Sequence, residues 1–204
     1  MGQPDTRATL ILRIRDTGDE EAWNEFVEIY TPLIFNFAVS RGLQPADARD
    51  VLQIVLHNIF RAIPKFHYDP KKGTFRSWLY TIVRHEVFRH LRTSGRQPQS
   101  SDPSELKHNG ELTDDPEAKR WEFDYRLRLF QWASDKVEPE FTPRNWQAFY
   151  RTAVKEEDPA EVAKDLGMSR AAVYVSRSRV LSRLREKVAN VADQDWAPGL
   201  EKRN

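Results

Sequence analysis

Basic side chains gather in two segments of the chain, together with aromatic or small polar residues that suit binding to nucleic acid. Residues 65–96 hold eight lysines and arginines against two acids, and residues 169–187 hold six against one. Lysine and arginine neutralise phosphates, and aromatic faces stack on unpaired bases at about 1–3 kcal/mol per base. The net charge is only +1 because residues 16–50 and 102–124 are acidic. This segregation favours two contacts with one polyanion, against the alternative of simple solvated helix faces.

The most specific motif begins at Asp158, which is followed by a proline at the first helical position and by Glu161. This pattern predicts a short helix. Gly167 supplies the left-handed residue that ends it, and Ser169 caps the next helix. The spacing predicts a helix-turn-helix, whose second helix enters the major groove of DNA, rather than an ordinary helical hairpin with a polar surface. The side chains available to the groove are Arg170, Ala171, Tyr174, Arg177, Ser178, Arg179 and Arg183.

The helical periodicity of apolar residues predicts an all-α protein of two small helical domains joined by a flexible linker. In the first domain, residues 1–96, a capping box at Thr17 starts a helix that Pro32 kinks. A second helix begins at Pro45, a residue that suits the first turn. Thr74 caps a third helix, whose apolar residues face inward and whose arginines are expected to face outward.

Residues 97–117 are rich in polar residues, proline and glycine, as a flexible tether requires. The hydrophobic pattern resumes with Trp121 and Tyr125, so we expect these residues to open the second domain. That domain takes residues 118–190 and contains the helix-turn-helix, and residues 191–204 form a tail.

The acidic segment 102–124 motivates a separate hypothesis. An acidic tether that joins two basic domains can fold the two domains together in the idle protein and bury their DNA-binding surfaces. Under this hypothesis, neutralising Asp114, Asp115 and Glu117 raises DNA binding by the free chain.

Several classes of function are excluded or disfavoured by composition. The sequence has no cysteine, which excludes disulfides and thiol catalysis and suits a reducing cytoplasm. No apolar run approaches the roughly 20 residues of a membrane span, and no signal-peptide pattern is present. His85 and His90 resemble a zinc-protease motif, but a spacing of five residues turns the two side chains apart on a helix. We therefore expect no enzyme activity, no metal, no cofactor and no membrane insertion.

Residues 19–92 and 121–187 resemble the extracytoplasmic-function (ECF) sigma factors, which belong to the sigma-70 family of RNA polymerase subunits. Segment 47–53 is similar to the family segment that binds the clamp helices of the polymerase large subunit. Segment 73–79 resembles the start of the segment that melts and reads the −10 promoter element, and the helix-turn-helix resembles the domain that reads the −35 element. The resemblance implies an alternative sigma factor that binds core RNA polymerase and directs initiation at specific promoters.

The resemblance also implies roles for individual residues. The implied polymerase contacts are Asp47, Asp50, Gln53, Ile54 and His57. The implied contacts for −10 binding and melting are His67, Tyr68, Lys71, Lys72, Arg76, Trp78, Arg84, His85, Arg89 and Arg92. Two of these assignments have alternatives, because Trp78 also fits a core position and acids such as Asp47 are common in a helix's first turn. An anti-sigma factor or another regulatory protein is a further implied partner.

The chain departs from the family pattern at several of these positions. Ile54 stands where the family usually has Glu, and His85 and Arg89 stand where Asn and Asp are common. In the recognition helix, Tyr174 and Ser176 replace a commoner Lys and Arg. We therefore expect an atypical promoter sequence. The rival interpretation is a helix-turn-helix regulator that binds DNA alone, but a sensor or dimerisation domain would not need a basic last helix.

Overall fold

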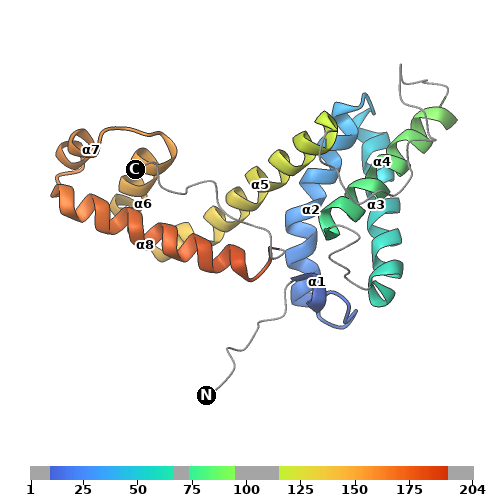
Figure 1. Ribbon diagram of the computed structural model, residues 1–204, viewed down its shortest axis with the longest axis horizontal. Helices are drawn as coiled ribbons and strands as arrows, with labels where there is room; N and C mark the ends of the chain where they lie inside the picture. The colour runs from blue at the N-terminus through green and yellow to red at the C-terminus, as the bar shows by residue number, and fades with distance from the viewer. Residues whose placement is uncertain (1–9, 67–73, 95–114, 193–204) are drawn as a thin grey trace. The chain divides into compact units, whose positions relative to one another are not determined.

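The computed structural model describes residues 10–66, 74–94 and 115–192 of the chain. The described residues form helices, turns and short connections, with no β-strand among them (Figure 1). The predicted all-α fold class is confirmed. The chain divides into two compact units, Met1–Arg128 and Leu129–Asn204, which are called unit 1 and unit 2 below.

Unit 1 begins with the short helix α1 (Leu10–Arg13) and the long helix α2 (Glu20–Ser40). Asp19 caps α2, because its carboxylate accepts a hydrogen bond from the Ala22 amide at 2.9 Å. The predicted cap at Thr17 is therefore wrong. Aspartate is at least as good a cap as threonine, and this one stands directly before the first helical turn.

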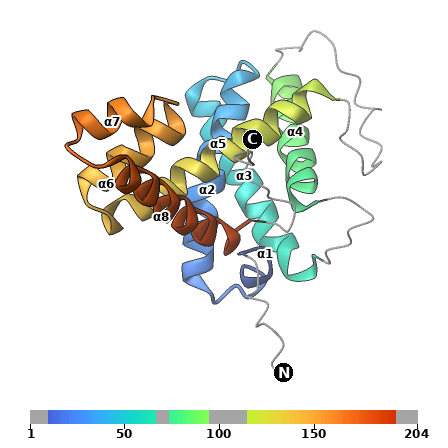
Figure 2. The ribbon, with the colours of Figure 1, turned by 60° about the vertical axis from the view of Figure 1, so that its left-hand side comes forward.

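Helices α3 (Pro45–Ala62) and α4 (Phe75–Thr93) form a bundle with α2 (Figures 1 and 2). The helix α2 continues through Pro32, as the apolar stripe on both sides of that residue predicts. A 3-10 turn, η1 (Ile63–Lys65), follows α3. The hydroxyl of Thr74 caps α4, as predicted. The three main helices of unit 1 thus begin within a few residues of their predicted starts.

The core of unit 1 lies between α2, α3 and α4 and is rich in aromatic rings. Phe26 stacks on Tyr30 with ring centroids 4.5 Å apart, and both rings meet Phe75 of α4 edge-on. Aliphatic residues at every third or fourth position fill the rest of the interior. The almost completely buried ones include Ile34, Val51, Val55, Ile59, Leu79, Val83 and Val87. Burial of such side chains, at about 1.5–3 kcal/mol each, stabilises the bundle more than helix propensity does.

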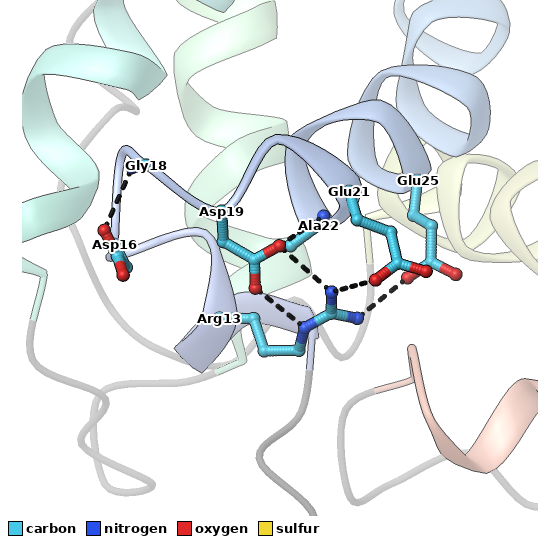
Figure 3. A network of polar contacts seen from close by, with 7 residues as sticks. All are labelled: Arg13, Asp16, Gly18, Asp19, Glu21, Ala22 and Glu25. Atoms are coloured by element: carbon cyan, nitrogen blue, oxygen red, sulfur yellow. Dashed lines mark hydrogen bonds and ion pairs between the residues drawn. The ribbon is translucent and has the colours of Figure 1, made fainter.

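Arg13 fastens α1 to the start of α2 (Figure 3). Its Nε and Nη2 atoms donate to the two carboxylate oxygens of Asp19 at 3.0 and 3.1 Å. The same guanidinium donates to Glu25 at 3.1 Å and to Glu21 at 3.3 Å. The hydrogen bond between Arg13 and Asp19 lowers the pKa of the acid and raises the pKa of the arginine. Because α1 is a single turn that would not persist alone, this network and the burial of Leu10 hold it in place.

The helix α5 (Pro116–Val137) contributes residues to both units, and the division falls after Arg128. In unit 1, Tyr125 stacks on Tyr30 of α2 with ring centroids 5.7 Å apart. Trp121 meets another aromatic ring of α2 edge-on at 5.5 Å. These two aromatic residues were expected to open the second domain, but they complete the core of unit 1. The predicted start of that domain falls within a helix that packs on unit 1.

In unit 2 the described residues form four helical segments after a 3-10 turn, η4 (Glu138–Glu140). They are α6 (Pro143–Phe149), the π-helical turn η5 (Tyr150–Val154), α7 (Pro159–Asp165) and α8 (Arg170–Ala189). Both α6 and α7 pack against α8 (Figure 2). A small apolar core between these three helices consists of Ala148, Val162, Ala163 and Val173, with Leu166 and Met168 packed against it.

The chain after α8 remains part of unit 2 for a few residues. The Ala192 amide donates to the Val188 carbonyl at 2.8 Å, and Val191 and Ala192 expose only 2% and 6% of their surfaces. The predicted tail therefore begins with residues that are buried in unit 2. Residues 193–204 lie outside the described part of the chain.

Candidate nucleic-acid interface

The start of α8 presents most of the predicted recognition residues at the surface. The Ser169 hydroxyl accepts a hydrogen bond from the Ala172 amide at 3.1 Å and caps the helix, as predicted. Arg177 is half-buried. The exposed members of the predicted set are Arg170, Ala171, Tyr174, Ser178 and Arg179. Within the described residues, no acid pairs with Arg170 or Arg179, so the charges of these two arginines are available to phosphates.

The turn that leads into α8 is fixed by backbone conformation and by one arginine. Gly167 has a φ of 59°, the left-handed conformation predicted for it. Its carbonyl accepts a hydrogen bond from Arg144 of α6. The Met168 amide donates to the Ala163 carbonyl at 2.8 Å, and Asp158 caps α7 through two backbone amides. Both helices and the turn between them thus lie at their predicted positions.

A second arginine, which sequence reasoning missed, holds α7 in place. Arg151 of η5 donates from Nε to Glu157 at 2.6 Å and from Nη2 to Asp165 at 2.9 Å. These two hydrogen bonds raise the pKa of Arg151. Its partners lie in the loop before α7 and at the end of α7, so no helical periodicity in the sequence connects them.

Arg183 was predicted to contact DNA, but in the structure its charge is engaged within unit 2. Its Nε and Nη2 atoms donate to the Glu140 carboxylate at 2.5 and 3.1 Å, and Nη1 lies 2.8 Å from Glu186. The hydrogen bond from Arg183 lowers the pKa of Glu140, and its two acidic partners raise the pKa of Arg183. Arg183 therefore links α8 to η4.

Two predicted DNA contacts on α4 are turned toward α5. Arg76 exposes only 5% of its surface, its Nε donates to Glu122 at 3.0 Å, and its guanidinium lies 5.0 Å from the Tyr125 ring centroid. Arg84 donates from Nε to Glu117 at 3.1 Å. The expectation that the arginines of this helix face outward is wrong for these two, because α5 supplies acids that pair with them.

Glu117 is the centre of a polar cluster formed by the C-cap residue of α2, by α4 and by the start of α5. One of its oxygens accepts hydrogen bonds from the Tyr80 hydroxyl at 2.9 Å and from Arg84. Its other oxygen lies 2.5 Å from Nη2 of Arg41. The Tyr80 hydroxyl also lies 3.2 Å from Asp115, and burial together with the nearby negative charge raises the pKa of Tyr80. Two acids of the acidic segment 102–124, Asp115 and Glu117, thus contact the basic helix α4 within unit 1.

The remaining residues implied in −10 binding fall into three groups. His85, Arg89 and Arg92 are exposed, and Arg89 reaches the buried Glu86 at 2.7 Å. Trp78 is half-buried and packs on two phenylalanines at 4.8 and 5.3 Å, which fits its alternative role in the core. Lying outside the described residues are His67, Tyr68, Lys71 and Lys72, together with Asp114 of the acidic segment.

Most of the predicted polymerase contacts are exposed on α3. Asp50, Gln53, Ile54 and His57 follow one another at spacings that keep them on one side of the helix. Asp47 is half-buried and lies 3.6 Å from Nε2 of His90 on α4. Ile54 is 37% exposed, an apolar side chain in the middle of a polar face.

The described residues contain neither a cluster of metal ligands nor a helix suited to span a membrane. No group of three or more His, Asp or Glu side chains in residues 10–66, 74–94 and 115–192 is arranged to hold a metal ion. His85 and His90 differ in their surroundings, since the first is exposed and lies beside Glu86, while the second faces Asp47. Among the helices of the described residues, none has the length and apolar character needed to cross a membrane.

Comparison with known families identifies the α2–α4 bundle. Residues 26–97 match the family model described as sigma-70 region 2. The matched residues include most of α2 and all of α3 and α4, so the similarity to sigma-70 region 2 covers the bundle.

Two curated relatives illustrate the similarity. The ECF RNA polymerase sigma factor RpoE of Cereibacter sphaeroides is 30% identical over 94 residues, 46% of this chain and 50% of the relative. The ECF RNA polymerase sigma-E factor of Escherichia coli K12 is 32% identical over 102 residues, 50% of this chain and 51% of the relative. The chain spans about half the length of the curated relatives it matches. Residues 26–97 are similar to sigma-70 region 2, and the curated relatives that the chain matches over half their length are ECF sigma factors.

A solved structure is also similar over most of its length. It is the structure of CnrH in complex with the cytosolic domain of CnrY. The matched chain of that structure is 20% identical in sequence to this chain. The alignment covers 89% of this chain and 96% of that chain, with a TM-score of 0.36.

Proposed function

We propose that this chain is an alternative sigma factor, which binds core RNA polymerase and directs it to specific promoters. The observation that carries the proposal is the match of residues 26–97 to sigma-70 region 2. The curated relatives, matched over half their length, are named as ECF RNA polymerase sigma factors, which supports the same function. The role requires binding and positioning without catalysis by this chain.

In this proposal each part of the chain has a separate task. Residues 1–96 act as the region 2-like domain that binds the polymerase clamp and the −10 element. Residues 118–190 act as a region 4-like helix-turn-helix domain that reads the −35 element, and residues 97–117 link the two. An anti-sigma factor or another regulatory protein is a further proposed partner. The bacterial cytoplasm, where polymerase meets DNA, is the proposed location.

The exposed face of α3 is the proposed polymerase contact. Asp50 and His57 offer polar groups there, and Ile54 adds an apolar surface that loses water on binding. A mixed patch of this kind suits a protein partner better than DNA, because its acid would repel phosphates. Polymerase binding through this face leaves the basic residues at the end of α4 available to promoter DNA.

The proposed contact of α4 with DNA requires a change of partners. Arg92 is exposed and able to meet phosphates directly, whereas Arg89, also exposed, already lies 2.7 Å from the buried Glu86. Arg84 is bound to Glu117, and Arg76 is bound to Glu122. A phosphate that binds either of these inner arginines must displace a carboxylate, so DNA and the start of α5 compete for the same groups.

The proposal is tested by binding of the purified chain to core RNA polymerase, followed by promoter-dependent transcription with the reconstituted complex. Reversing the charge of the α3 face with Asp50→Arg is expected to weaken polymerase binding about tenfold, which corresponds to about 1.4 kcal/mol. The matched control is Glu20→Arg, an exposed acid at the start of α2 that lies before the matched segment. This control is expected to bind polymerase like the unmodified chain.

The two principal outcomes separate the candidate functions. Tight polymerase binding that depends on Asp50 supports the sigma-factor role. If the chain ignores polymerase yet binds duplex DNA with sequence preference, it acts as a stand-alone regulator, and the proposal is wrong.

A further inference from the structure

The exposed face of α8 has an uncharged centre. Ala171, Val175, Ser178 and Ser182 follow one another at spacings of three or four residues, so they share one face of the helix, and all four are exposed. Tyr174 lies beside them. Val175 and Tyr174 leave 49% and 48% of their surfaces open, so both are accessible to a ligand. Val175 was absent from the residues predicted to contact DNA.

Arginines flank this centre on both sides. Arg170 and Arg177 follow one edge of the face, and Arg179 stands at the other. The buried residues Val173 and Val180 occupy the opposite side of the helix and hold it in unit 2. A cylinder with charged edges and an uncharged middle suits the major groove, where phosphates line the rims and base edges form the floor.

The residue types at the centre limit how bases can be read. Bidentate recognition of guanine requires arginine or lysine, and bidentate recognition of adenine requires asparagine or glutamine. The face from Ala171 to Ser182 has none of these at its centre. Small apolar side chains instead contact the C5-methyl group of thymine, which protrudes into the major groove. The serines are able to bond any base edge and add little discrimination.

We infer that α8 reads thymine methyl groups, with Val175 and Ala171 as the residues that set this specificity. The inference rests on the proposed DNA-binding role of α8 and names what that helix recognises. The flanking arginines then supply affinity through phosphates, while discrimination among bases comes from burial of methyl groups. Ser176, a position singled out for its departure from the family, is buried and bonded to the Ala172 carbonyl, so it is unable to restore a base contact.

The experiment starts with a duplex of known sequence that the chain prefers. The full chain is used to select binders from a pool of random-sequence duplexes, and the enriched duplex is then synthesised in two forms. One form contains thymine, and in the other single thymines are replaced by uracil, which lacks only the methyl group. Burial of one methyl is worth about fourfold in affinity, so at least one uracil replacement is expected to weaken binding by about that factor.

Two matched variants assign the effect to a residue. In Val175→Ala the thymine form is expected to bind about fourfold more weakly, and the sensitive uracil replacement is expected to have little further effect. Val154→Ala is the control, because Val154 is 41% exposed in the same unit but belongs to η5. This variant is expected to retain the full difference between thymine and uracil.

The outcomes distinguish the inference from the function on which it rests. If the chain selects a duplex but every uracil replacement leaves binding unchanged, methyl reading is overturned and the DNA-binding role stands. A uracil effect of the same size in the unmodified chain and in Val175→Ala also overturns the assignment to Val175. If no duplex is enriched, the DNA-reading role of α8 fails, and the inference fails with it.

Discussion

Replacing Glu117 by glutamine is expected to weaken the packing of the start of α5 against α2 and α4 within unit 1. The Glu117 side chain is only 14% exposed, and it meets the Tyr80 hydroxyl at 2.9 Å, Arg84 at 3.1 Å and Arg41 at 2.5 Å. Glutamine keeps one acceptor oxygen but loses the charge, and its amide turns a donor toward one of the two arginines. One guanidinium is therefore left without an acceptor.

The size of the effect follows from the burial of the groups involved. A hydrogen bond to a charged group contributes about 1.5–3 kcal/mol net, and the arginine side chains are 33% and 15% exposed, so water compensates only in part. We expect a loss of about 2 kcal/mol, or roughly 30-fold in the equilibrium between docked and open α5. The aromatic contacts of Trp121 and Tyr125 with α2 are unaffected, so unit 1 is expected to stay folded.

Amide hydrogen exchange measured by mass spectrometry reports this opening directly. Peptides from the first half of α5 are expected to exchange roughly 30-fold faster in Glu117→Gln, while peptides from α8 are unchanged. The control is Asp124→Asn on the same helix. Its partner Arg120 is 72% exposed, and a solvent-exposed pair at this spacing contributes only about 0.3–0.5 kcal/mol, less than threefold in exchange.

The reasoning is refuted if the two variants change α5 exchange by the same factor, because burial of Glu117 would then have no special effect.

A second measurement addresses the competition between α5 and nucleic acid. Neutralising Asp114, Asp115 and Glu117 together is expected to raise binding of the free chain to a single-stranded oligonucleotide. Each additional phosphate contact should steepen the dependence of log K on log salt by about 0.7. Unchanged binding would remove the hypothesis of a covering acidic segment.

Three further predictions concern the ends of helices. Asp19→Asn is expected to lower the melting temperature at neutral pH. Because the hydrogen bond from Arg13 lowers the pKa of Asp19 in the folded chain, the contribution of this carboxylate is present above the unfolded-state pKa and is lost as the pH falls through the folded-state pKa. The melting temperatures of the two proteins should therefore converge as the pH falls below about 4. Gly167→Ala places a Cβ in the left-handed region, 3.3 Å from Nη2 of Arg144, and is expected to cost about 1–2 kcal/mol, seen by calorimetry as a lower melting temperature of unit 2. Ser169→Ala removes the cap of α8 and should cost about 1 kcal/mol, measured by urea unfolding; an unchanged midpoint would show that the cap is replaceable by water.

Local chemistry explains what the sequence could predict. The caps at Thr74, Asp158 and Ser169 and the left-handed Gly167 each depend on residues within four positions, so they are readable from the sequence alone. The start of α2 was misplaced by two residues, because several capping residues stand side by side before it.

Contacts between distant segments were not predictable in the same way. Arg76 pairs with Glu122, 46 positions along the chain, and charge alone favours an outward arginine. A weaker signal was available, since Arg76, Tyr80 and Val87 follow a helical spacing and mark a second buried face of α4. That face meets Trp121 of α5. Aromatic periodicity located the buried residues of α5 but could not say which core they join.

The packing of α5 has a practical consequence for dissecting this protein into pieces. The segment that matches the family model ends at residue 97, but Tyr30 is covered by Tyr125 and Tyr80 by Trp121. At the other end, a fragment starting at residue 26 would lose the Asp19 cap and the whole Arg13 network. A piece cut at the limits of sequence similarity would therefore expose aromatic surface that promotes aggregation, and the first turn of α2 would lose its cap. For recombinant work, the unit of folding extends to both sides of the unit of homology.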